Sequence, residues 1–150
     1  MLLKKITALT LAGFMTLGAV ASFAQDAFVA PTTPEAAVAA REVLMKSNGA
    51  TLKAAGALTG AEASAAMQTL LDNFTNMAAV FPEGSITGDS KASPAIWQDW
   101  AGFTAIIDTG KAAATAGLAA AETGDATAYG AALKAIGATC GTCHEQYRLK

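Results

Sequence analysis

The stretch that decides the fold is Cys140-Gly141-Thr142-Cys143-His144, which holds both cysteines and the only histidine of this 150-residue chain. Cys-x-x-Cys-His is the attachment signature of c-type haem, in which each thiol adds to a vinyl group and the imidazole ligates the iron. On a helix these positions are i, i+3 and i+4, so the three side chains project from one face. The motif therefore predicts one covalent haem c, anchored by Cys140 and Cys143 and ligated by His144.

Three other interpretations of the motif remain open from the residues alone. Two cysteines in an oxidising compartment can form a disulfide, which would leave a haem-free helical binding protein. A zinc site needs about four ligands, whereas this motif supplies only three. A thiol redox pair usually follows a strand and opens a helix, whereas this motif lies near a helix end. The histidine directly after Cys143 favours haem.

The N-terminus has the anatomy of a cleaved export signal. Lys4 and Lys5 precede an apolar run over residues 6–20, and a small-residue cleavage site ends at Ala24. The run is shorter than the roughly 20 residues of a membrane-spanning helix, which disfavours an N-terminal anchor. We expect residues 1–24 to be removed and residues 25–150 to form a periplasmic domain that does not insert into a membrane.

The expected mature chain is acidic. Without Lys4 and Lys5 it has eight basic against twelve acidic residues, a formal charge of −4. No basic stripe remains, so nucleic acid is not an expected partner.

Hydrophobic periodicity indicates helices throughout the mature region. The expected helices cover residues 34–56, 61–80, 93–122 and 126–147. Two of them start with a capping hydroxyl and a proline, at Thr33-Pro34 and Ser93-Pro94, and Asp125 is the expected cap of the last. Their apolar stripes predict an all-α antiparallel four-helix bundle with Trp100 in its core and Trp97 at a helix edge or subunit interface.

The haem motif continues the apolar stripe of the last helix, through Tyr129 and Ile136 to Tyr147, so we expect the haem in the bundle interior. Met45, Met67 and Met77 are the methionines of the mature region. A methionine on the iron makes a low-spin electron-transfer haem, whereas an open sixth position in an apolar pocket binds neutral gases such as NO and CO.

Residues on the first helix provide further candidates. Arg41, Met45 and Asn48 share one face, and an arginine on a core-facing side suits a haem propionate. Asn48 is the polar group expected nearest the distal side of the haem.

Four features together resemble the cytochrome c′ family, the class II cytochromes c, over the whole mature region. They are the haem motif close to the C-terminus, Arg41-x-x-x-Met45-Lys46, Pro94-x-Ile96-Trp97 and Tyr147-Arg148. The resemblance implies a four-helix bundle in which His144 is the proximal ligand and Met45 lies over the distal face. In most of the family the iron is five-coordinate, and in a low-spin c556-like subgroup a methionine of this region is the sixth ligand.

The resemblance also implies roles for the remaining candidates and for partners. Arg41 matches a position near the propionates, Arg148 a basic residue beside the proximal imidazole, and Phe81 a pocket aromatic. The expected function is electron transfer, binding of NO or CO at five-coordinate iron, or both, with Met45 ligation as the alternative. Redox proteins are the expected partners, and a homodimer is a further implication. No catalytic constellation appears beyond the haem, so we do not expect an enzyme.

Overall fold

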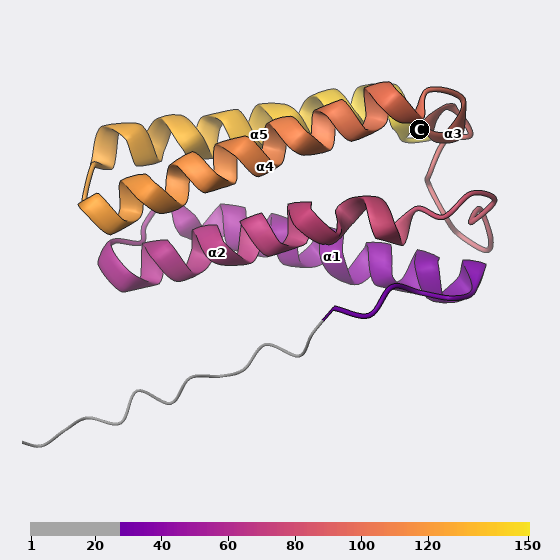
Figure 1. The fold of residues 1–150 in the computed structure, drawn as a ribbon, viewed down its shortest axis with the longest axis horizontal. Helices are drawn as coiled ribbons and strands as arrows, with labels where there is room; N and C mark the ends of the chain where they lie inside the picture. Colours follow the sequence, from indigo (N-terminus) through magenta and orange to yellow (C-terminus); the bar gives the residue numbers. More distant parts are fainter. Residues whose placement is uncertain (1–27) are drawn as a thin grey trace, which may run out of the picture.

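Two layers of paired helices face each other in the computed structural model, which describes residues 28–150 (Figure 1). The expected signal segment, residues 1–24, lies outside this range. One layer holds α1 and α2, and the other holds α4 and α5. The elements are α1 (Pro34–Ala55), α2 (Gly60–Met77), the short 3₁₀ helix η1 (Ala78–Val80), α3 (Ala95–Gln98), α4 (Trp100–Thr123) and α5 (Ala126–Tyr147). Successive long helices run in opposite directions, which confirms the predicted antiparallel bundle.

Local capping chemistry sets the helix ends, as the sequence predicts. The Thr33 side chain accepts a hydrogen bond of 3.1 Å from the amide of Ala36, and Pro34 takes the first helical position. Asp125 accepts from the amide of Ala128 at 2.9 Å. Gly124 ends α4 with a φ of 72°, a left-handed conformation that glycine adopts without steric cost.

The expected third helix, residues 93–122, is not continuous, so that prediction is wrong. The chain leaves the helical region at Asp99, whose φ and ψ are −129° and 57°, and this residue separates α3 from α4. Its carboxylate instead accepts from the amide of Gly102 at 3.1 Å and caps α4. An aspartate side chain that binds nearby backbone amides favours a helix start over a helix interior.

The break also corrects the expected position of Trp100, which is 39% exposed rather than buried in the core. The change of backbone direction at Asp99 alters the helical phase, so Trp100 no longer shares a face with Ile96. Trp97 is half-buried, and its indole donates to the Phe81 carbonyl at 3.1 Å.

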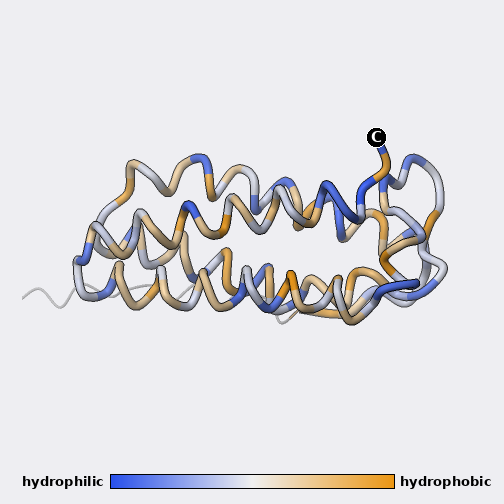
Figure 2. The backbone as a smooth tube through the Cα atoms, turned by 90° about the horizontal axis from the view of Figure 1, so that it is seen from above, coloured by the Kyte–Doolittle hydropathy of each residue, from blue (hydrophilic) through white to orange (hydrophobic). Residues whose placement is uncertain are grey.

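The core lies between the two layers and contains the predicted stripes of α2 and α4. The most deeply buried large apolar side chains are Phe103, Met67, Leu70, Ile96, Ile136 and Val80. Hydrophilic and hydrophobic residues are interspersed along each helix (Figure 2). No helix within residues 28–150 combines the length and the apolarity needed to cross a membrane.

Candidate functional site

The haem motif occupies the last two turns of α5, at the end of the bundle where α3 and the C-terminus lie (Figure 1). Cys140 and Cys143 are half-buried and pack against the hydrophobic core, and both are free thiols. His144 is exposed in the protein chain alone. The expected continuation of the buried stripe therefore holds for the two cysteines and Tyr147 but not for His144, which lies at the edge of the stripe.

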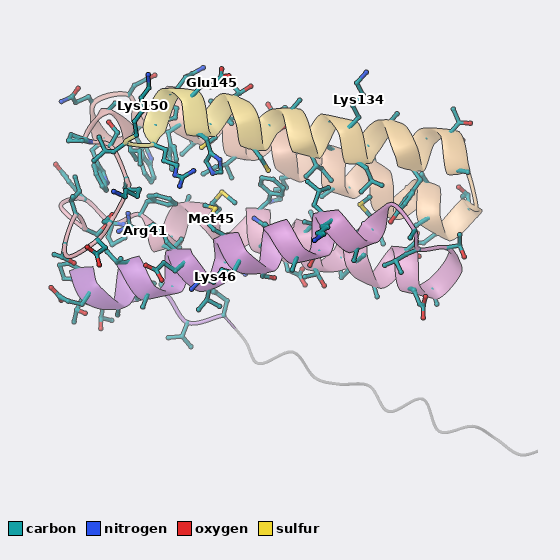
Figure 3. The ribbon with its side chains drawn as sticks, turned by 180° about the vertical axis from the view of Figure 1, so that it is seen from behind. Arg41, Met45, Lys46, Lys134, Glu145 and Lys150 are labelled. Atoms are coloured by element: carbon teal, nitrogen blue, oxygen red, sulfur yellow. The ribbon has the colours of Figure 1, made fainter. Side chains whose placement is uncertain are left out.

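Two cavities open beside the motif. The larger has a volume of about 390 Å³ and lies toward the end of the bundle, and the smaller, of about 190 Å³, extends between the long helices. Three residues line both cavities: Met45 of α1, and Cys143 and His144 of α5. Figure 3 shows Met45 and Arg41 pointing from α1 into the space below α5. The chain thus has room between α1 and α5 at the place where the motif projects.

Burial controls the protonation of the motif. It raises the pKa of Cys140, and together with the neighbouring Cys140 it raises the pKa of Cys143 to about 11. A redox-active cysteine needs a lowered thiol pKa, so these thiols do not fit the redox-pair interpretation. Burial and the positive charge of Arg148 lower the pKa of His144, which favours the neutral imidazole that ligates metals.

The zinc interpretation gains no support from the structure. Within residues 28–150, histidine, cysteine and acidic side chains do not gather in groups of three or more that could hold a metal ion.

Arg41 is buried between α1 and the loop that follows η1. Its Nη2 donates to the carbonyl oxygen of Ser85 and, at 2.9 Å, to the Ser85 hydroxyl. Its guanidinium lies 4.7 Å from the centre of the Phe81 ring, a cation–π contact. Nothing in the sequence had singled out Ser85, because its partner lies 44 residues away in the chain.

One nitrogen of Arg41, Nη1, is buried without a hydrogen-bond partner among residues 28–150. A buried donor without a partner costs free energy of about 1–3 kcal/mol, and more for a charged group. Because Arg41 lines the larger cavity, an acceptor in that cavity would remove the cost. A haem propionate is such an acceptor, and the charge-assisted bond would be strong.

All seven side chains predicted for the site line one cavity or both. Phe81 is buried and meets Phe103 edge-on at 4.9 Å between ring centres. Arg148 is exposed at the larger cavity, where its backbone bridges to Ala92. The residues of this set are Arg41, Met45, Phe81, Cys140, Cys143, His144 and Arg148.

The smaller cavity is mostly apolar. Its lining includes Leu52, Phe74 and Met77, with Asn48 at its polar edge. The side-chain oxygen of Asn48 accepts from Asn73 at 2.8 Å, so α2 holds this amide. A flat, largely apolar macrocycle with polar substituents at one edge fits both the apolar interior and the polar outer rim. The residues present therefore suit a covalent haem.

Comparison with known proteins agrees with this fit. The family model described as "Cytochrome C'" matches residues 36–148. A curated relative named cytochrome c-556, from Agrobacterium fabrum, is 36% identical over 100% of this chain and 98% of its own length. A cytochrome c′ from Rhodospirillum rubrum is also 36% identical, over 69% of this chain and 71% of the relative.

A solved structure extends the similarity to three dimensions. The nitric oxide complex of a mutant cytochrome c′ from Alcaligenes xylosoxidans superposes with a TM-score of 0.71 at 28% identity. The match covers 80% of this chain and 98% of that structure.

Proposed function

Because the chain belongs to the cytochrome c′ family, whose members carry covalent c-type haem, we propose that it is an electron-transfer haem protein with His144 on the iron. Cys140 and Cys143 would form the thioethers. The observation that supports this assignment is the meeting of the two cavities at Met45, Cys143 and His144. When bound, the haem supplies an iron that cycles between the ferric and ferrous states.

Met45 is the proposed sixth ligand. It comes from α1, faces the space below α5, and lines both cavities together with His144. A thioether opposite the imidazole would give a six-coordinate, low-spin haem with a raised reduction potential. A relative that spans the whole chain is a cytochrome c-556, and the c556-like subgroup is the one expected to use this ligand.

The polar groups at the larger cavity would orient the haem. Arg41 would give its unpartnered Nη1 to a propionate, while Ser85 and the Phe81 ring hold the guanidinium in place. Arg148 would sit beside His144 on the proximal side, since its positive charge already lowers the pKa of that imidazole. These contacts would fix the haem in one orientation within the bundle.

A second candidate function is the binding of NO or CO at a five-coordinate iron. The apolar lining of the smaller cavity and the engagement of Asn48 by Asn73 favour it, since neutral diatomic gases need no hydrogen-bond donor. A nitric oxide complex is known for a mutant of the Alcaligenes xylosoxidans cytochrome c′. In this case Met45 would close the pocket without a bond to iron.

The ferric absorption and electron-resonance spectra separate these candidates. We expect a low-spin spectrum with a methionine–iron charge-transfer band for the wild type and a high-spin spectrum for Met45→Ala. Met77→Ala is the matched control, because this methionine also lines the smaller cavity but not the larger one. A high-spin wild type that takes up NO readily would instead support the gas-binding candidate.

Export is part of the proposal. Removal of residues 1–24 would release a periplasmic mature chain that begins at Gln25, carries one haem, exchanges electrons with redox proteins and pairs as a homodimer. Mass spectrometry of the protein from a host with haem-attachment machinery tests the mature N-terminus and the added haem mass together. A mature chain without added haem would contradict the assignment and leave the disulfide interpretation.

Sedimentation of the same sample measures the oligomeric state.

A further inference from the structure

Tyr147 forms hydrogen bonds with residues on both sides of α3. Its hydroxyl donates to the carboxylate of Asp99, just after α3, at 2.7 Å. Its carbonyl oxygen accepts from the amide of Ser93, just before α3, at 2.9 Å. Although the side chain carries a hydroxyl, it is only 5% exposed. The last turn of α5 is therefore fastened to both ends of α3, and its side-chain contact with Asp99 at the start of α4 spans 48 residues of sequence.

The Asp99–Tyr147 pair is closely fitted to its surroundings. One carboxylate oxygen of Asp99 accepts from the amide of Gly102 and the other from Tyr147, so both oxygens are engaged. A Cβ added at Gly102 would overlap the Asp99 carboxylate and lie 2.7 Å from the Tyr147 hydroxyl. Only a glycine at this position lets α4 approach the pair so closely.

The pair adjoins the haem motif. Tyr147 follows Cys143 by four residues and His144 by three, so it lies one helical turn beyond them on the same side of α5. Its ring lines the larger cavity and meets Phe103 edge-on, with ring centres 5.4 Å apart. Any rotation of this last turn would move the imidazole and the Tyr147 ring together.

We infer that Asp99 and Tyr147 are positioning residues for the iron ligand: their hydrogen bond fixes the rotation of the last turn of α5 and with it the direction of the His144 imidazole. The inference depends on the proposed ligation of iron by His144. Imidazole orientation relative to the haem affects the iron–histidine bond and hence the reduction potential. This Asp99–Tyr147 hydrogen bond, the clamp, would make the iron–histidine bond and the reduction potential depend on a contact that touches neither haem nor iron.

Tyr147→Phe tests the clamp, because it removes the hydroxyl and keeps the ring that packs on Phe103. The matched control is Tyr129→Phe, since Tyr129 is the other buried tyrosine of α5 and donates to the Ala55 carbonyl at 3.0 Å, about three turns before the motif begins. We expect both variants to lower the midpoint of thermal unfolding by a similar amount. Only Tyr147→Phe should shift the g values of the ferric electron-resonance spectrum and the reduction potential.

Two further variants test the same contact without loss of the phenol. Gly102→Ala keeps every polar group and forces the pair apart, so it should reproduce the spectral shift of Tyr147→Phe. Asp99→Asn keeps an oxygen for the α4 cap but offers an amide to the hydroxyl, and it should give a smaller shift in the same direction. Combined with Tyr147→Phe, it should add nothing further.

Wild-type g values and a wild-type reduction potential in both Tyr147→Phe and Gly102→Ala would overturn the inference, as would an equal shift in Tyr129→Phe. Haem content and histidine ligation of the wild type are measured on the same samples. A wild type without haem contradicts the proposed function, whereas a haem-loaded wild type with unchanged variants contradicts only the clamp.

Discussion

The two ends of the bundle differ in how closely their helices pack. At the end remote from the haem motif, small residues of α4 bring the layers together: a Cβ added at Gly117 would lie 2.6 Å from the Met67 sulfur and 3.1 Å from the Ala132 Cβ. At the motif end, cavities of about 390 and 190 Å³ separate α1 from α5. The bundle is thus closely packed around Gly117 and leaves room for a cofactor beside the motif.

Polar contacts differ between the ends as well. At the remote end the Tyr129 hydroxyl donates one hydrogen bond to the Ala55 carbonyl, which joins α5 to the end of α1. At the motif end the hydrogen-bonded side chains of Arg41 and Tyr147 also line the larger cavity, whereas Tyr129 lines neither cavity. The remote end is therefore built for packing alone, whereas the motif end combines packing with the orientation of a bound group.

The largest effect is expected from Phe103→Ala at the motif end. Phe103 is 1% exposed and contacts the rings of Phe81 and Tyr147, so its loss should cost about 3–5 kcal/mol of unfolding free energy. Denaturant unfolding of the haem protein measures the cost, and the ferric spectrum should change because a cavity wall is lost. Phe103→Leu, with less loss of volume, should be milder on both measures. An unchanged spectrum in Phe103→Ala would contradict the proposed division of the bundle.

A smaller effect is expected from Gly117→Ala at the remote end. The added methyl group overpacks the contact with Met67, and we expect a loss of about 1–3 kcal/mol with an unchanged haem spectrum. The control is Gly130→Ala on α5, where nothing lies within 4 Å of an added Cβ. There, alanine should stabilise the helix by about 0.5–1 kcal/mol. A Gly117→Ala protein with the unfolding free energy of the wild type would mean that the layers are not in tight contact there.

The smallest effect concerns alkaline pH. The hydrogen bond to Asp99, with burial next, raises the pKa of Tyr147 to about 12, and burial raises the pKa of Tyr129. Because the folded-state pKa of Tyr147 exceeds the ordinary tyrosine value of about 10, its stabilisation is complete below pH 10 and is lost as pH rises toward 12.

Ultraviolet titration of phenolate formation, run on wild type and Asp99→Asn, checks this prediction. Asp99→Asn should move the ionisation of Tyr147 to lower pH and leave that of Tyr129 unchanged. An unaltered titration would show that the carboxylate does not hold the hydroxyl.

Local features of the sequence determined most of the fold and the membership of the site. Caps such as Thr33 and Asp125 and the apolar stripes act within a few residues, so the four long helices follow from short-range rules. The motif and its helical spacing likewise placed Cys140, Cys143 and His144 on one face. Arg41 was found because an arginine on a core-facing stripe needs a partner, and Met45 was placed over the distal face by the resemblance to the cytochrome c′ family.

Only the tertiary structure decided the contacts between distant segments. Ser85 as the partner of Arg41, the break at Asp99 and the exposure of Trp100 depend on where α1, α5 and the loop before α3 meet. The sequence signal of Asp99 is ambiguous, since the same side chain is acceptable on an exposed helix face. Its role follows from Tyr147, 48 residues away, because a hydrogen bond at that separation depends on the packing of whole helices and not on local propensity.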